Sequence, residues 1–141
     1  MRKKGFSLVE LLIVLAVMAA LIATITPVAL NAIRKAKATQ VAQNLKTLAS
    51  AFENMLYVDG TSNITTDVSE LARDVDKNYK IAYESNTTGE YTVTVYYTGE
   101  DVDPSSVADV LSGATTSTDR IANGVTTGTN YIYYTINITA Y

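Results

Sequence analysis

Two side-chain types that do much of enzyme chemistry are missing from this chain of 141 residues, which has no histidine and no cysteine. A Ser-His or Cys-His nucleophile pair, a zinc site built on these ligands and a disulfide are therefore excluded. Any catalysis would rest on carboxylates, Lys, Tyr or Ser, and no Gly-rich loop of the phosphate-binding kind is present. The formal net charge of −3 also argues against general nucleic-acid binding. We therefore expect that the chain is not an enzyme and that it does not bind a specific nucleic-acid sequence.

One cluster of oxygen ligands deserves a metal hypothesis. Glu100, Asp101 and Asp103 stand close together just before Pro104, and clustered carboxylates can bind calcium. Their spacing fits no defined calcium-binding loop, so a solvated acidic turn is the favoured interpretation. We expect no cofactor.

A single carboxylate placed against an apolar segment is the more informative feature. The first five residues form a basic tract ending in Gly5, and the 23 residues from Leu11 to Ile33 carry no charge. That run meets the ~20 residues a transmembrane helix needs and exceeds the ~7–15 residues of a secretory signal core. Glu10 lies at its start, where a carboxylate in lipid is costly unless paired. Pro27 lies toward its other end, where it removes one backbone donor and disfavours helix just before it.

Residues 4–10 read Lys-Gly-Phe-Ser-Leu-Val-Glu, and with the apolar run they resemble the class III signal of type IV prepilins and of the pseudopilins of secretion and competence systems. The resemblance covers about the first 30 residues. It implies that residues 1–5 are a leader, that a prepilin peptidase cuts between Gly5 and Phe6, and that the same enzyme methylates the new amine of Phe6. It also implies that Glu10 acts in filament assembly. The family often has a helix-breaking glycine between Glu10 and Pro27; this chain has none there, so local melting of the helix in a filament should centre on Pro27.

Simple electrostatics makes sense of this pattern. Cleavage would expose an ammonium group at Phe6, a second costly charge in or near lipid. The Glu10 carboxylate of one subunit can neutralise the Phe6 amine of a neighbour as a filament grows. Such pairing offsets two desolvation costs at once, so it would favour the assembled state and set the axial register.

The periodicity of residues 6–58 predicts one long helix that changes character along its length. Residues 6–30 would lie in the membrane or in a filament core, and residues 31–58 form an amphipathic segment. Asp59-Gly60 supplies the stop signal. The apolar stripe of the second segment consists of Ile33, Val41, Leu45, Leu48, Phe52 and Leu56.

Residues 59–141 are expected to form a small α+β head packed on the second half of that helix. Its predicted helices are residues 67–78 and 104–111, the latter capped by Asp103. Its predicted strands are 79–85, 91–98 and 131–140, which alternate apolar and polar residues. An antiparallel sheet of about three strands on a long N-terminal helix is the pilin-like lollipop architecture that the resemblance also implies.

Two features of the head have no assigned role from the pattern alone. Residues 112–130 are rich in Ser, Thr, Gly and Asn, which favours an exposed, partly ordered loop open to glycosylation. The alternative is a hairpin in which a type I′ turn at Asn123-Gly124 joins Arg120–Ala122 to residues 125–127. One face of the last strand would carry Tyr131, Tyr133, Thr135, Asn137, Thr139 and Tyr141. That face is interpreted as a half-buried sheet surface or a contact between subunits.

Charge is divided unevenly between the two parts. Residues 6–58 carry four basic and two acidic side chains, whereas residues 59–141 carry four basic and twelve acidic ones. A basic stem and an acidic head suggest complementary contacts between subunits and a soluble outer surface. The alternative is that Arg34, Lys35 and Lys37 only anchor the helix at lipid headgroups.

The leading functional hypothesis is a structural subunit of a type IV pilus, serving adhesion, twitching motility or DNA uptake. The precursor would sit in the cytoplasmic membrane and then enter a homo-oligomeric, helical surface filament. Its partners would be the prepilin peptidase and a pilus or secretion assembly platform. The alternative is a pseudopilin of a type II secretion or competence system, and a membrane-anchored binding protein or enzyme is the third hypothesis.

Overall fold

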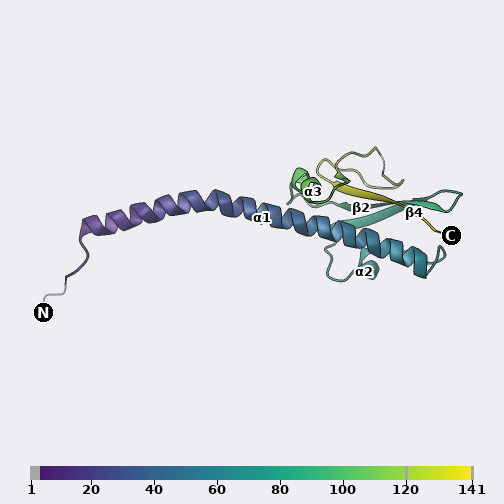
Figure 1. Ribbon diagram of the computed structural model, residues 1–141, viewed down its shortest axis with the longest axis horizontal. Helices are drawn as coiled ribbons and strands as arrows, with labels where there is room; N and C mark the ends of the chain where they lie inside the picture. The colour runs from purple at the N-terminus through teal and green to yellow at the C-terminus, as the bar shows by residue number, and fades with distance from the viewer. Residues whose placement is uncertain (1–3, 120, 141) are drawn as a thin grey trace. The chain divides into compact units, whose positions relative to one another are not determined.

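The computed structural model describes residues 4–119 and 121–140, and the chain divides into two compact units, Met1–Arg34 and Lys35–Tyr141. Helix α1 (Leu8–Val58) begins in the first unit and ends in the second (Figure 1). It starts two residues later than expected and ends as expected at Val58, before Asp59-Gly60. Gly60 has a φ of +69°, the left-handed conformation common after a helix end.

The second unit contains a four-stranded antiparallel sheet on which the end of α1 packs. The strands are β1 (Tyr79–Ser85), β2 (Glu90–Tyr97), β3 (Ala114–Thr115) and β4 (Ile132–Thr139). Their order across the sheet is β1-β2-β4-β3. The α+β class and the three longer strands are confirmed. The fourth strand is a correction, because β3 lies inside the segment expected to be a loop.

The hairpin between β1 and β2 depends on one glycine. Gly89 has a φ of +79°, and a Cβ there would stand 2.8 Å from the carbonyl oxygen of Ala140. The two backbone segments come this close because the Ala140 N–H donates a hydrogen bond to the Gly89 carbonyl oxygen at 3.0 Å. The hairpin turn is thereby tied to the residue that follows β4.

The inner face of the sheet buries the predicted stripe of α1. Five of its six members, from Val41 to Leu56, are buried, and Ala38, Ala42, Ala49 and Met55 extend the same face. Ile33 is the exception at 54% exposed, and it belongs to the first unit. At the centre, Phe52 is fully buried with its ring 5.6 Å from that of Tyr83. The sheet contributes alternate residues such as Val93 and Val95, both fully buried.

Part of the outer face of the sheet is covered by the loop that follows β3, although most of the described residues of 112–130 are exposed, as expected. Tyr133 is fully buried there, its hydroxyl accepting from the Gly128 N–H at 3.2 Å. The Ala122 N–H donates to the buried Thr94 hydroxyl at 2.9 Å. The rings of Tyr96, Tyr131 and Tyr133 pack together with centroids 5.9–6.5 Å apart. Part of the Tyr-rich face is therefore a packing surface within the chain, because burying these large rings removes apolar area from water.

The alternative hairpin in this loop is not formed. Residues 121–130 contain no strand, and of the two turn residues only Gly124 has a positive φ, whereas a type I′ turn needs positive φ at both. Arg120 and Tyr141, which belonged to the expected hairpin and to the expected Tyr-rich face, lie outside the described residues.

The first short helix of the second unit is much shorter than expected. α2 spans only Val68–Leu71, with Asp67 as the N-cap that accepts from the Ser69 N–H at 2.9 Å. The helix ends where Ala72 becomes extended, and Asp74 then has a φ of +62°. The Asn78 carbonyl accepts from the Thr98 N–H at 2.9 Å, next to the Tyr79–Tyr97 pair, so residue 78 is bonded to the end of β2 and not within a helix. Strand pairing therefore overrides local helix propensity.

The second short helix is close to its prediction but its cap differs. α3 spans Pro104–Val110, and Asp103 stands at the N-cap position without capping a backbone N–H. Its carboxylate accepts instead from the hydroxyls of Ser105 and Ser106, and these hydrogen bonds lower the pKa of Asp103.

A polar link joins α1 to the segment before α3. The Tyr97 hydroxyl donates to one Asp101 oxygen at 2.6 Å, and Lys37 Nζ lies 3.3 Å from the other. The Tyr97 hydrogen bond, with a smaller contribution from Lys37, lowers the pKa of Asp101. Burial, with the Asp101 carboxylate, raises the pKa of Tyr97. Tyr97 therefore stays protonated and donates at any physiological pH.

Replacing Phe52 by Ala should destabilise the second unit by about 3–5 kcal/mol, because it leaves a cavity between α1 and the sheet. Val58→Ala, at a side chain 82% exposed, is the control and should cost less than about 0.5 kcal/mol. The measurement is urea unfolding of the full chain in lipid nanodiscs, followed by tyrosine fluorescence. A loss below about 1 kcal/mol for Phe52→Ala would show that this core is not formed as described.

Asp101→Asn should lower the stability of the second unit at neutral pH, by less than about 1 kcal/mol because the pair is half exposed. The folded state lowers the pKa of Asp101 below its ordinary 3.8, so the carboxylate stabilises the fold above that pH. This contribution is lost as the pH falls through the folded pKa. The difference between the two proteins should therefore shrink to zero in acid, and a difference that grows below pH 4 would contradict the assignment.

Candidate functional site

The segment that the sequence marks for processing is not helical. Lys4, Gly5, Phe6 and Ser7 precede α1, and all four residues are exposed, Phe6 by 87%. The Gly5–Phe6 peptide bond therefore lies outside the helix and is accessible to solvent. The rest of the expected leader, which includes Arg2 and Lys3, lies outside the described residues.

Nothing in the chain's own structure requires a glycine at position 5. Its φ lies outside the left-handed region, and a Cβ built on it would have no heavy atom within 4 Å. A conformational or packing reason for this glycine is thus absent among the described residues.

The first turn of α1 is closed by a reciprocal pair of hydrogen bonds. The Ser7 N–H donates to Glu10 Oε2 at 2.9 Å, and the Glu10 N–H donates to Ser7 Oγ at 3.2 Å. This is a capping box, in which the N-cap hydroxyl and the acidic side chain three residues later satisfy each other's backbone donors. It explains why α1 begins after Ser7 rather than at Phe6.

The capping box also fixes where the Glu10 carboxylate lies. It is folded back toward Ser7, one residue from Phe6, whose nitrogen would become the new amine after cleavage. Glu10 was expected to act at this end of α1, whereas the role of Ser7 was not predicted. The signal was present as Ser-x-x-Glu directly before an apolar run, which is the sequence signature of this motif.

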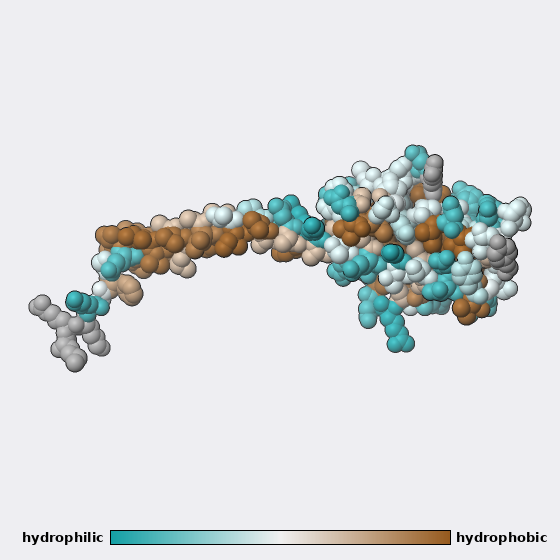
Figure 2. Space-filling view, in the orientation of Figure 1, coloured by the Kyte–Doolittle hydropathy of each residue, from teal (hydrophilic) through white to brown (hydrophobic). Residues whose placement is uncertain are grey.

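The apolar part of α1 lies in the first unit, and its large side chains are exposed. Figure 2 shows the hydrophobic surface along it. All 16 large apolar side chains from Phe6 to Ile33 are exposed, by 49–87%. The helix is apolar all round rather than on one stripe, and it contains a window long and hydrophobic enough to cross a membrane, with a mean hydropathy of 2.8. Such a surface needs lipid or other apolar helices around it.

The few polar groups within this segment are satisfied inside the helix. The hydroxyls of Thr24 and Thr26 donate to the carbonyls of Ala20 and Ile22 at 2.8 and 2.7 Å. This arrangement suits a surrounding without water.

α1 runs without interruption through Pro27, so in the single chain this residue does not break the helix. A break there in an assembled filament stays a prediction.

The carboxylates considered for calcium do not converge. Asp101 contacts Tyr97 and Lys37, and Asp103 contacts Ser105 and Ser106. Within residues 4–119 and 121–140, no group of three or more acidic side chains is arranged to hold a metal ion.

The chemistry that the N-terminal segment can offer is an accessible peptide bond, a positioned carboxylate and a large apolar surface.

Comparison with known proteins supports this view of the N-terminus. Residues 1–26 match the family described as the prokaryotic N-terminal methylation motif. This motif is the class III prepilin signal of type IV pilins and pseudopilins, and it implies processing by a prepilin peptidase and assembly into pilus-type polymers. Searches of curated proteins and of solved structures found no match. The motif and the fold point to a structural subunit rather than an enzyme, made as a membrane-anchored precursor.

Replacing Ser7 by Ala should loosen the first turn of α1, because the Glu10 N–H loses its acceptor. A lost N-cap costs about 1 kcal/mol, which corresponds to roughly fivefold faster amide hydrogen exchange at Glu10. Ser7→Thr keeps the hydroxyl and should leave exchange nearly unchanged. The measurement is hydrogen exchange by NMR on the full chain in nanodiscs. Equal exchange in Ser7→Ala and the unchanged chain would mean that the capping box does not form.

Proposed function

We propose that this chain is the structural subunit of a type IV pilus, cut between Gly5 and Phe6 by a prepilin peptidase, methylated at Phe6 and polymerised through α1. The observation that carries the proposal is the completely uncovered apolar half of α1 directly behind a prepilin signal. The buried core residues of the second unit lie from Ala38 onward, outside the apolar half of α1. The surface is therefore free for lipid first and for copies of the same helix afterwards.

The size of this surface sets the requirement for assembly. Burying one large apolar side chain is worth about 1.5–3 kcal/mol, so sixteen of them amount to tens of kcal/mol. A subunit leaving the membrane would lose that stabilisation unless neighbouring helices replaced the lipid at once. Packing of α1 against other copies of itself supplies an apolar surrounding of the same kind.

Apolar contacts alone do not fix how far one subunit is displaced along the filament axis from the next. Glu10 and the amine of Phe6 can fix that displacement. Both groups are charged and both would enter the apolar interior of a filament. A salt bridge from Glu10 of one subunit to the Phe6 amine of the next would compensate both charges and define a single axial offset. The capping box supports this role because it holds the carboxylate at the end of the helix where the amine is created.

The charge distribution supports a membrane start and a solvated exterior. Arg34 and Lys35 follow the apolar run directly and are exposed, a position typical of headgroup contacts. Residues 59–141, with twelve acidic against four basic side chains, would form the outer surface in water.

Substitutions at Glu10 can separate charge pairing from helix capping. Glu10→Gln keeps a side chain that can close a capping box but removes the charge, so processing should be normal while the yield of surface filaments falls at least about tenfold. Glu10→Val removes both functions and should also impair assembly while leaving cleavage possible. The assay is filament yield after shearing cells in which the variant is the sole pilin, with cleavage followed by mass in the membrane fraction.

Glu53→Gln is the matched control, since it removes an equivalent carboxylate from the part of α1 that lies in the second unit. It should leave both cleavage and filament yield unchanged. Normal filament yield from Glu10→Gln would refute the proposed salt bridge. Equal loss in Glu53→Gln would show that charge at any position on α1 has the same effect.

A further inference from the structure

Three asparagines of the chain are followed two positions later by a threonine, namely Asn63, Asn86 and Asn137. The sequence Asn-x-Thr, in which x is not proline, is the acceptor sequence for N-linked glycosylation. A transferase attaches a sugar to the amide nitrogen of the asparagine, and the hydroxyl two residues later is part of what it recognises. Neither asparagine of residues 112–130, the segment expected to be open to glycosylation, is followed by such a hydroxyl.

Asn86 is the first residue of the turn that joins β1 to β2. Its N–H donates to the Glu90 carbonyl at 2.8 Å, and the Gly89 N–H donates to the Asn86 carbonyl at 3.3 Å. The chain therefore reverses its direction within these five residues. Asn86, Thr87 and Thr88 are all exposed, so the complete acceptor sequence lies at the surface of the second unit.

The amide nitrogen that would carry the sugar is held only weakly. It donates to Glu90 Oε2 at 3.4 Å, longer than the usual range of about 2.7–3.2 Å. Giving up an exposed hydrogen bond of this length costs little, because water can replace it. Pairing between β1 and β2 ends at Ser85 and Tyr91, so an enzyme can bind residues 86–88 without separating the two strands.

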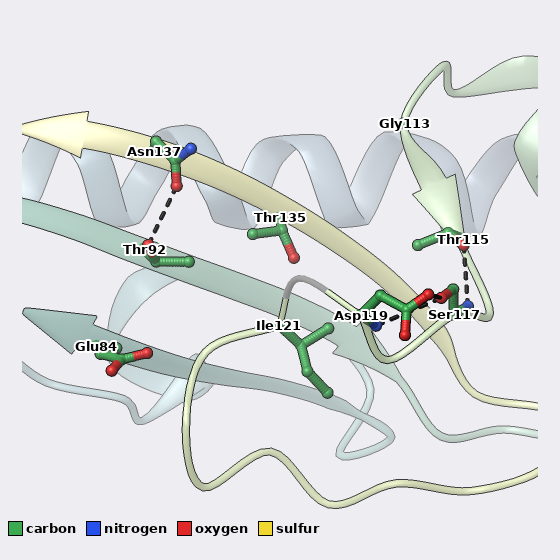
Figure 3. Close-up of a pocket in the computed structure, with 9 residues that line it drawn as sticks. All are labelled: Glu84, Thr92, Gly113, Thr115, Ser117, Asp119, Ile121, Thr135 and Asn137. Carbon is green, nitrogen blue, oxygen red and sulfur yellow. Dashed lines mark hydrogen bonds between the residues drawn. The ribbon is translucent and has the colours of Figure 1, made fainter.

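Asn137 has the same acceptor sequence but lies within the sheet. It belongs to β4, which is paired with β2 along its whole length. Its side-chain oxygen accepts from the Thr92 hydroxyl at 3.2 Å, across the two strands (Figure 3). Thr139 follows on the same face of the strand, about 6.8 Å further along. An enzyme that enclosed this segment would have to separate β4 from β2.

Asn63 is exposed, but the two residues that follow it are held by the second unit. Ile64 packs against the hydrophobic core. The Thr65 hydroxyl accepts from the Asp67 N–H at 3.1 Å. A transferase would have to displace both side chains to bind this sequence, whereas the turn at Asn86 presents its residues at the surface.

We propose that Asn86 is an N-glycosylation site whose donor is a sugar linked through pyrophosphate to a membrane lipid. The Asn86 amide nitrogen forms a bond to the anomeric carbon of the sugar, while the bond from that carbon to the pyrophosphate oxygen breaks. The lipid pyrophosphate leaves with the electron pair, and the amide nitrogen gives up one proton. This chain supplies the acceptor, and a separate transferase supplies the base. A membrane-anchored precursor shares the membrane of such a donor.

The site rests on export of the second unit across the membrane, which the proposed function includes, but not on filament assembly. The modification is therefore measured on the chain extracted from the membrane fraction, whether or not filaments form. Protease added to cells stripped of their outer layers shows separately whether the second unit is exported. An unmodified Asn86 in a chain that the protease digests would overturn this site alone. A chain protected from the protease would overturn both proposals.

The test is mass spectrometry of tryptic peptides from the chain purified from its native cells, with fragmentation that keeps the sugar on the peptide. Cleavage after Lys and Arg separates the three acceptor sequences, which fall in residues 47–73, in residues 81–120 and in the peptide that begins at Ile121. The peptide of residues 81–120 should carry the added mass of one or more sugar units on Asn86. A sugar on Asn63 or Asn137 with Asn86 unmodified would contradict the assignment.

Variants of the turn identify the modified atom. Asn86→Gln removes the acceptor amide and Thr88→Ala removes the recognised hydroxyl, so each should abolish the added mass. Thr88→Ser keeps the hydroxyl and should retain the modification. Thr87→Ala, the matched control at the neighbouring exposed threonine, should retain it as well. These surface changes should leave the fold intact.

The same variants can overturn the proposal. Added mass that persists in Asn86→Gln would place the sugar on a hydroxyl group and not on the amide. Added mass that persists in Thr88→Ala would show that the acceptor sequence is not what the transferase recognises.

Discussion

The structure depends on how one helix meets two different surroundings. Over residues 8–33, α1 exposes large apolar side chains in every direction, and over residues 38–56 it buries a single stripe against the sheet. The sheet buries the apolar stripe of the second half, whereas the first half exposes its apolar side chains. An apolar surface of this size calls for lipid or other apolar helices around it, and the internal hydrogen bonds at Thr24 and Thr26 fit surroundings without water. The prepilin signal at its start gives that requirement a biological context.

The parts of the fold that follow from strong local periodicity could be predicted. The stripe from Val41 to Leu56 repeats at helical spacing, and β1, β2 and β4 alternate clearly, so their boundaries were found within one residue. Glu10 could be singled out because a carboxylate at the edge of an apolar run stands out energetically. These features depend on residues that are close together in the chain, so they can be predicted from the sequence.

The errors arise where distant contacts decide the local structure. Residues 112–130 look like a free loop by composition, yet they contain β3 and cover Tyr133, because a sheet face with several tyrosine rings needs a cover. The apolar residues Val68, Leu71 and Val75 suggested a helix to residue 78, but only the first turn forms, since β1 must pair from Tyr79. Ser7 was missed for another reason. Its Ser-x-x-Glu signature is local, but the charge of Glu10 alone does not show which backbone donors the two side chains satisfy.

The central claim is that the chain is processed at Gly5–Phe6 and then becomes the main component of a surface fibre. Mass spectrometry of filaments sheared from the native cells tests it most directly, with the membrane fraction as the comparison. We expect the N-terminal peptide of this chain to dominate the filaments and to begin at a methylated Phe6. A processed chain found only in the membrane fraction would contradict the pilus assignment and favour a pseudopilin. A terminus that still contains Met1 or Arg2 in both fractions would contradict processing altogether.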